Sequence, residues 1–543
     1  MHRIKTSLTA AFVVLVSSST TALGQSVTVD EVMRALQNEM AEVEGTLTFS
    51  ASDISPDGDV TINGFDLYIG AVKQRIVFDE LVIDNVRKDT SGRIVYDGYV
   101  AKGVKQTFSN SGGNNGTIFS DQIVAEGITV TTNSADQNPL WNLDIPSVKY
   151  NNATFAVKVP EGSAEFSMPV MRFSGVSQKG VKSASLEGAE INNLSGELVL
   201  ENGQGKFPLN VENLSISNFK QFGGEGYEIG EIKWGKTTAE FPNPDGRTQV
   251  LFDGFVAKNI YAPDLSDPNS KLVTDKKTEV TIGALETLIN GKPVFNWVGG
   301  GGFNQLDPAT GVLQGSGSLN KMMIDFSAIP VPPSGQNNLA TLRNLGYEQI
   351  TMNILAGGKW DLDTGTLEIS EYDIEVENAG SIKMDARIAG YTEDVARNIQ
   401  KLANEVNAET DPQAQQIKSM QMLAALTTLS VQSLRLSVED QTLLNKVVNY
   451  QAGLLNQEPE QITQIVGPMA QVMLAPYNVP EFAASVTQAL NTFMEGNKTI
   501  TVTAEPEGGL VLTEIIALSS GVQAGQISPA EIIQRLNLKV ETK

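Results

Sequence analysis

The sequence predicts a mainly β protein with some α structure: a long antiparallel, duplicated and curved β-sheet, followed by a mainly helical C-terminal region. Apolar and polar residues alternate from residue 46 to about residue 390, in segments rich in Val, Ile and Thr. Turns rich in Gly, Asn, Asp and Ser separate these segments, and no helix-length segment lies between them up to residue 328. A ten-residue phrase also occurs twice, as VYDGYVAKGV at 95–104 and LFDGFVAKNI at 251–260. The phrase indicates that one structural unit was used twice.

Residues 1–24 are expected to be a cleavable export signal. Arg3 and Lys5 give it a positive start, residues 8–16 form a short apolar run, and small residues at 22–24 form the cleavage site. Residues 25–45 then have the spacing of one amphipathic helix, which Gly45 is expected to end. Its apolar face would carry Val32, Leu36, Met40 and Val43. Because no later apolar stretch has spanning length, we expect no transmembrane segment after signal cleavage.

The duplicated β-sheet region is predicted at 46–328. Several of its strands end on the same pair, a Gly or Asn followed by an apolar residue: Asn85-Val86, Gly103-Val104, Gly127-Ile128 and Gly175-Val176. If the repeated phrase is one strand, its alternation places Asp97 and Lys102 on opposite faces, and Asp253 and Lys258 likewise. A single ligand site needs its side chains on one face. We therefore favour structural duplication over a ligand site used twice.

The remainder of the chain is predicted in three parts. A Pro-rich joint at 329–338 is followed by a β-hairpin region at 339–390 and a mainly α-helical region with short strands at 391–543. One strand, SVQSLRLSV, interrupts the helices. The stripe Met420, Met422, Met469 and Met473 lies on predicted helices, where helix core is the expected role and an apolar ligand or partner groove the alternative.

Composition excludes several classes of function. The chain has 63 acidic and 39 basic residues and a formal charge of −24, so we expect no nucleic-acid partner. It has no cysteine, and its single histidine is His2, inside the predicted signal. The mature protein would therefore lack the groups for Ser-His-Asp or Cys-His catalysis and for the usual zinc sites. On this basis we predict that the protein is not an enzyme.

Three segments have features of sites, and each has a simpler structural interpretation. The segment 53–64 places Asp53, Ser55, Asp57 and Asp59 as a calcium loop would, but Gly64 stands where a bidentate Glu is needed, which favours a polar turn. The Gly-rich segment 297–303 lacks the Gly-Lys-Ser/Thr ending of a phosphate loop, which favours a flexible or bulged strand junction. Carboxylate pairs such as Asp361/Asp363 and Glu375/Glu377 could serve a histidine-independent hydrolase but are typical of the solvent face of strands. We assign no catalytic, cofactor-binding or metal residues and expect no cofactor.

The arrangement resembles the AsmA-like envelope proteins, particularly the YdgA-type group of periplasmic proteins. The resemblance rests on the export segment, the helix after it, the strand cadence, and the phrase WDLDTGTLEISEYDIEVENAGSIKM at 360–384 followed by helices. The chain differs from that group in carrying a cleavable signal where the group keeps a membrane anchor. The resemblance implies a curved sheet with an apolar inner face and a part in envelope homeostasis, including the handling of lipid.

These observations lead to one expected function and two alternatives. We expect a non-enzymatic periplasmic envelope protein that binds lipid-like or apolar ligands, or an envelope protein partner, on its curved sheet. A secreted or surface structural or adhesive β-rich protein is the first alternative. A carboxylate-based hydrolase is the second.

Overall fold

The structure is a computed structural model, and its contacts divide the chain into two compact units, residues 1–270 and 271–543. The residues it describes are 27–32, 34, 45–69, 73–88, 94–109, 115–132, 141–159, 162–179, 183–200, 205–222, 226–243, 246–263, 273–329, 338–409, 411–496, 499–523 and 527–543. The expected export signal lies outside these residues. Of the expected helix at 25–45, residues 29–32 and 34 are helical, and Gly45 begins a strand.

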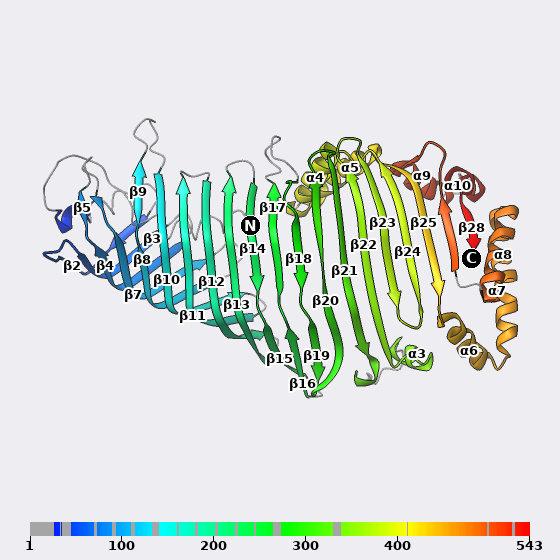
Figure 1. Cartoon of the computed structure of the whole chain (residues 1–543), viewed down its shortest axis with the longest axis horizontal. Coiled ribbons are helices and arrows are strands. Elements are labelled where there is room, and N and C mark those ends of the chain that lie inside the picture. The colour runs from blue at the N-terminus through cyan, green and yellow to red at the C-terminus, as the bar shows by residue number, and fades with distance from the viewer. Residues whose placement is uncertain are drawn as a thin grey trace. The chain divides into compact units, whose positions relative to one another are not determined.

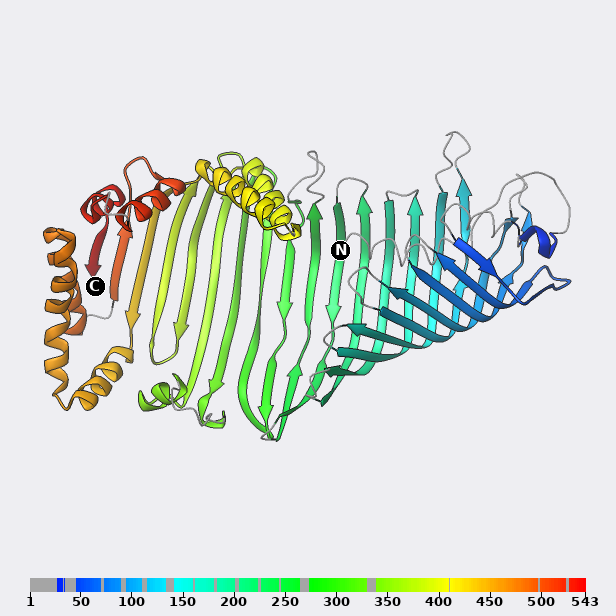
Figure 2. The same ribbon diagram turned by 180° about the vertical axis from the view of Figure 1, so that it is seen from behind.

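The first unit is an antiparallel meander, as the sequence predicts (Figure 1). Each long strand pairs with the next one along the chain, and the long strands curve strongly along their length (Figure 2). Its strands are β1 Gly45–Thr48, β2 Ala51–Ile54, β3 Val60–Ile69, β4 Gln74–Asp84, β5 Arg87–Lys88, β6 Ile94–Val95, β7 Gly98–Ser109, β8 Asn115–Glu126, β9 Thr129–Thr132, β10 Trp141–Val159, β11 Gly162–Lys179, β12 Ser183–Leu200, β13 Gly205–Phe222, β14 Gly226–Trp234, β15 Thr237–Asn243, β16 Gly246–Phe252 and β17 Phe255–Pro263.

Two rows of irregular positions cross this meander. They account for the pairs of Gly or Asn followed by an apolar residue that recur in the sequence. Left-handed backbone recurs in them on every second strand, always at Gly or Asn, the residues that tolerate positive φ best. The first row comprises Gly64, Asp79, Gly103, Asp121, Asn152, Pro169, Asn193 and Glu212, of which Gly64, Gly103, Asn152 and Asn193 have positive φ. The second comprises Asn85, Asp97, Gly127, Pro146, Gly175, Glu187, Asn218, Gly230 and Asn259, of which Asn85, Gly127, Gly175, Asn218 and Asn259 have positive φ.

At each row, the alternation of side chains between the buried and the exposed face of the sheet shifts by one residue. In β4, Ile76 and Phe78 are buried before the first row, and Leu81 and Ile83 are buried after it, so two residues instead of one separate Phe78 from Leu81. The register of the ladder is unchanged across the row. Bulge-like interruptions of this kind bend strands and raise their twist. The rows therefore account for the curvature of the strands.

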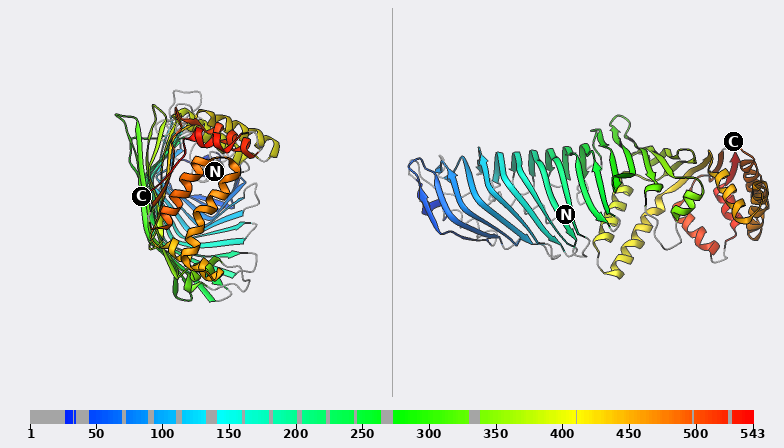
Figure 3. Two further views of the ribbon diagram at one scale, coloured as in Figure 1. Left: turned by 90° about the vertical axis from the view of Figure 1, so that its right-hand side faces the viewer. Right: turned by 90° about the horizontal axis from the view of Figure 1, so that it is seen from below.

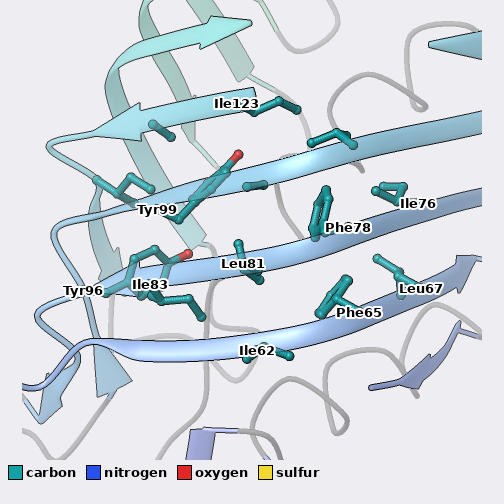
Figure 4. Close-up of a cluster of buried hydrophobic side chains, with 14 of the residues drawn as sticks. Ile62, Phe65, Leu67, Ile76, Phe78, Leu81, Ile83, Tyr96, Tyr99 and Ile123 are labelled. Carbon is teal, nitrogen blue, oxygen red and sulfur yellow. The ribbon is translucent and has the colours of Figure 1, made fainter. Parts of the chain in front are cut away.

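The inward side chains of the first strands fill a continuous core. Side chains from β3, β4, β7 and β8 point to the same side and pack together (Figure 4), and the rings of Phe65 and Phe78 stack with centroids 5.0 Å apart. Burial alone raises the pKa of the Tyr99 hydroxyl, and burial is the largest cause of the raised pKa of the Tyr150 hydroxyl. The chain's own side chains thus occupy the inner face in this part of the first unit.

The two copies of the repeated phrase adopt similar local structures. In each copy a strand ends, a two-residue break that includes the aspartate follows, and a strand carrying Val-Ala-Lys comes next, so the expectation of one uninterrupted strand was wrong. The break is Tyr96-Asp97 in the first copy and Asp253-Gly254 in the second. Lys102 lies opposite Glu80 at 2.5 Å between charged atoms, and Lys258 lies opposite Glu231 at 3.9 Å.

The aspartates of the two breaks are also paired with cations. Asp97 pairs with Arg87 at 2.7 Å, whereas Asp253 lies 3.8 Å from Lys236. The glycine after each aspartate is required by close backbone approach, because a Cβ on Gly98 or Gly254 would strike a carbonyl oxygen of the neighbouring strand. The shared aspartate, glycine and lysine therefore each have a structural role.

The second unit is also built on an antiparallel sheet, in which β18, β20, β21, β22, β23, β24, β25, β26 and β28 are successive neighbours. β19 pairs with β20, and β27 with β25. The strands are β18 Thr278–Ile282, β19 Leu285–Ile289, β20 Lys292–Asp307, β21 Val312–Asp325, β22 Gln349–Asp361, β23 Thr366–Val376, β24 Gly380–Ala389, β25 Ser430–Asp440, β26 Thr499–Ala504, β27 Leu510–Val511 and β28 Lys539–Thr542. Residues 330–337 of the predicted joint lie outside the described residues. Because β21 pairs with β22, the sheet of this unit continues across the joint.

The helices of the second unit begin at the caps that the sequence supplies. Thr392 and Ser528 accept hydrogen bonds from the first turns of α4 and α10, and Asp411 followed by Pro412 opens α5. The helices are α3 Asn338–Asn344, α4 Glu393–Ala408, α5 Pro412–Ala425, α6 Leu443–Leu455, α7 Pro459–Leu474, α8 Pro480–Met494, α9 Leu512–Gln523 and α10 Pro529–Leu536, with short 3-10 turns η2 Phe326–Ala328, η3 Leu426–Thr428 and η4 Ala475–Tyr477. No helix in the described residues combines the length and apolarity needed to cross a membrane.

The mainly helical C-terminal region and the strand inside it are confirmed. SVQSLRLSV lies in β25, which is an interior strand between β24 and β26. The sequence reasoning missed α3 and α9.

Candidate functional site

The sheet of the second unit has two chemically opposite faces. Residues directly opposite each other on paired strands share a face, and Ile382 lies opposite Val438, which lies opposite Ile500. The same registers place Met384, Leu436 and Val502 side by side. We call this side the apolar face; over β23–β26 it carries Ile374, Ile382, Met384, Leu434, Leu436, Val438, Ile500 and Val502.

The opposite side, the charged face, carries ion pairs between neighbouring strands. Lys383 lies 3.8 Å from Asp373 and 3.6 Å from Glu439, and Arg387 lies 3.6 Å from Glu368. Pairs of this kind suit a face that is in contact with water. Antiparallel sheets commonly keep one face solvated and pack the other against a second layer. By that rule the apolar face should be covered.

The centre of the apolar face is not covered. Ile382, Leu434, Leu436, Val438 and Val502 are each 37–44% exposed, and together they span three adjacent strands. Figures 2 and 3 show helices α4–α8 on one side of the sheet. Helices α4 and α5 lie toward one end of the strands, and α6–α8 lie toward β28. An apolar surface that is contiguous across strands is typical of a binding site, whereas single exposed apolar residues are not.

At one margin of the apolar face, an aromatic contact holds the start of α4. Trp360 shares this face, because it lies opposite Leu367, which lies opposite Ile388. Its indole Nε1 donates a 2.6 Å hydrogen bond to the carbonyl oxygen of Tyr391, and the two rings lie 5.0 Å apart. Tyr391 therefore lies on the apolar side of the sheet, just before α4.

Helix α7 also exposes an apolar stripe. Ile462 and Gly467 are buried, whereas Ile465, Met469, Val472 and Met473 are more than half exposed. The expectation that the methionine stripe belongs to a helix core was therefore wrong. Met420, Met469 and Met473 are each more than 60% exposed, and Met422 is half-buried. These side chains are exposed to solvent because the helices pack through their other faces. Helix α7, for example, packs against α8 through Gly467.

In the comparisons with known proteins, one match covers the part of the chain that carries much of the apolar face. A family model described as "Uncharacterized protein" matches residues 373–543. No curated protein matches the chain. The matched residues include β24–β28 and α4–α10, so the exposed centre of the apolar face lies within them.

The segments whose sequences resemble metal-binding or catalytic sites have structural roles. Residues 53–64 cover the end of β2, the turn at 55–59 and the start of β3. In the turn, Asp59 accepts hydrogen bonds at its carboxylate from the backbone of Asn85 and at its backbone oxygen from the amide of Ser55. Asp361 caps a turn by accepting hydrogen bonds from Thr364 and then from the amide of Asp363, which hold the pKa of its carboxyl below the usual range. Within the described residues, no three Asp or Glu side chains converge as metal ligands.

Two further segments have structural assignments. Glu375 accepts a 3.2 Å hydrogen bond from the amide of Asn353. The Gly-rich segment 297–303 lies inside β20 instead of at a break between strands. Gly299, with φ +115°, marks where β20 changes its partner from β19 to β18.

A shallow depression of about 420 Å³ lies on the charged face over β18, β20, β21 and β22. Bare backbone at Gly301 and Gly317 forms part of its floor, and Phe303 and Leu355 border it. The ammonium group of Lys277 lies 4.7 Å from the ring centroid of Phe303 and 2.6 Å from Glu279. The depression contains polar and apolar groups in similar measure, and no carboxylate pair converges within it.

Sequence reasoning missed the apolar face because its strands are far apart in the chain. The phrases SIKMDARIA, SVQSLRLSVED and TITVTA each alternate apolar with polar residues, which indicates three two-faced strands. Two long helical stretches separate them, so their pairing was not evident. The face carries no titratable side chain at its exposed centre, and what it can do chemically is to exclude water from an apolar partner.

Proposed function

We propose that this protein is a non-enzymatic periplasmic envelope protein that binds lipid-like ligands on the apolar face of its second unit. The supporting observation is the exposure of five aliphatic side chains, Ile382, Leu434, Leu436, Val438 and Val502, on the face opposite a set of ion pairs. Burying apolar area gains roughly 25 cal/mol per Å², so an alkyl chain laid on this face would bind without specific polar contacts. The resemblance to AsmA-like proteins and the expected export signal support the same function.

The first test measures binding of an apolar probe to delipidated full-length protein. N-phenyl-1-naphthylamine is expected to gain fluorescence with the wild-type protein. Leu436→Lys places a charge at the centre of the apolar face and should abolish most of this gain, because a buried ammonium group loses its hydration. Ser433→Lys adds the same charge to the same strand on the charged face and serves as the matched control. Equal binding by all three proteins would contradict the proposal.

Two further measurements address the ligand and the compartment. Mass spectrometry of an organic extract from the protein purified without detergent should show lipids that Leu436→Lys lacks. Osmotic shock should release the protein from the periplasm. Recovery from the medium or the cell surface would instead favour a structural or adhesive protein.

A further inference from the structure

Two helices of the second unit expose apolar stripes that contain methionine. The α7 stripe, in which every side chain is more than half exposed, comprises Ile465, Met469, Val472 and Met473. The α5 stripe, in which the side chains are 47–63% exposed, comprises Ile417, Met420 and Leu423. No charged residue occurs from position 461 to 480, so the α7 stripe has no charged neighbour along the chain. Thioethers therefore make up a large part of the exposed apolar surface of these two helices.

The thioether sulfur is the chemically reactive atom of these stripes. The chain has no cysteine, so its 14 methionines are its only sulfur-bearing residues. A hydroperoxide oxidises a thioether by transferring one oxygen atom. The sulfur lone pair attacks a peroxide oxygen, the O–O bond breaks, a sulfur–oxygen bond forms, and with hydrogen peroxide the second oxygen leaves as water. The product is methionine sulfoxide, which is polar where methionine is apolar.

Exposure separates the methionines into accessible and protected ones. Met420, Met469 and Met473 are 63%, 61% and 65% exposed, so an oxidant dissolved in water reaches their side chains. Met168 is 6% exposed and lies in the hydrophobic core of the first unit. The other methionines among the described residues are half-buried. Because a dissolved peroxide must contact the sulfur to oxidise it, the three exposed methionines should react first.

Oxidation of the exposed methionines changes the surface and leaves the packing of the helices in place. Helix α7 packs through Ile462 and Gly467, so sulfoxides at Met469 and Met473 stay in contact with water. They make two of the four side chains of the α7 stripe polar. A sulfoxide at Met168 would instead leave a polar group in an apolar core, which costs stability unless that group finds a hydrogen bond.

We infer that Met420, Met469 and Met473 are sites of reversible oxidation, at which peroxides make the surface of α5 and α7 more polar without unfolding the protein. Methionine sulfoxide reductases convert each sulfoxide epimer back to methionine, so the change can be undone. The inference goes beyond the proposed function, because it concerns side chains outside the apolar face and needs no bound ligand.

The test treats folded full-length protein with a limiting amount of hydrogen peroxide and measures the sulfoxide at each methionine by tandem mass spectrometry of its peptides. Met420, Met469 and Met473 should be oxidised at least about tenfold faster than Met168, whereas all four should react at similar rates in guanidinium chloride. Retention of the folded protein on a hydrophobic-interaction column should fall, and its thermal midpoint should be unchanged. Reductases for both sulfoxide epimers should restore the retention.

Variants connect the surface change to these three sulfur atoms. A triple variant, Met420→Leu with Met469→Leu and Met473→Leu, keeps apolar side chains of similar volume and should keep its retention after peroxide treatment. Met422→Leu, at the half-buried methionine of α5, is the matched control and should lose retention as the wild type does. The inference is overturned if Met168 is oxidised as fast as the exposed methionines, or if the triple variant loses as much retention as the wild type. Unfolding at the limiting dose, or no recovery with the reductases, would overturn it as well.

Discussion

Gly103 and Asn259 occupy the same position in the two copies of the repeated phrase, and both have left-handed backbone, with φ of 59° and 52°. The residue types differ, but glycine and asparagine are the two that accept this conformation at least cost. Beside Gly103, the carboxylate of Asp79 lies in the space that a side chain at this glycine would need. The pair of residues thus shows that a backbone conformation is the conserved feature of the two copies.

The first prediction concerns these two positions. Gly103→Val should destabilise the first unit by about 1–3 kcal/mol from left-handed strain alone, and further by displacing Asp79. Asn259→Gly should cost less than Gly103→Val, because glycine accepts the same φ and the substitution adds no backbone strain. Thermal unfolding of both variants checks this. A Gly103→Val protein as stable as the wild type would show that the two irregular rows are not needed for the fold.

The second prediction concerns the charged residues of the repeat. Lys102→Ala and Lys258→Ala should each lower stability by less than about 1 kcal/mol, because both lysines form exposed cross-strand pairs. Neither variant should change binding of N-phenyl-1-naphthylamine. Parallel loss of binding in both variants would revive the alternative that the phrase is a ligand site used twice.

The third prediction concerns pH. A hydrogen bond from the Asn85 amide, and then the Arg87 guanidinium, hold the pKa of Asp97 below its usual range. The stability that this carboxylate contributes is present above the unfolded pKa, about 3.9, and is lost as pH falls through the lower folded pKa. Asp97→Asn should therefore destabilise the protein at neutral pH and match the wild type in acid, as measured by denaturant unfolding at several pH values.

Asp84 provides a control with the opposite sign. Burial, and then repulsion by Asp59, Asp97 and Glu126, raise the pKa of Asp84. Its ionisation opposes folding once pH rises through the folded pKa, so Asp84→Asn should stabilise the protein at neutral pH. The gain should disappear below the unfolded pKa. A shift of the same sign in both variants would show that net charge, and not these local contacts, governs the pH dependence.

The fourth prediction concerns α7. Met469→Gln and Met473→Gln should change stability by no more than about 0.5 kcal/mol, because both side chains are exposed. Ile462→Ala, on the buried side of the same helix, should cost about 2–5 kcal/mol. Comparable losses in all three variants would return the methionines to the helix core.

The local patterns of the sequence are sufficient to predict the fold class but not the binding face. Alternation and helix caps are set by neighbouring residues, so the meander, α4–α8 and β25 were all predictable. The exposure of Leu436 depends on which strands pair and on where helices leave the sheet open, and those are contacts between distant segments. The break at Asp97 was missed for a related reason. Its backbone is fixed by hydrogen bonds with Asp84, at the end of β4, and with Ile128, between β8 and β9, and the phrase itself reads as unbroken alternation.

The two irregular rows of the first unit lie six positions apart on each strand they both cross, as Pro146 and Asn152 are in β10, and Gly175 and Pro169 in β11. A hairpin duplicated from this sheet would therefore contain the irregular positions of both rows at the same spacing as its neighbours. It could join its neighbours without any compensating change in them. Gain or loss of a whole strand pair would therefore preserve both rows in the rest of the first unit.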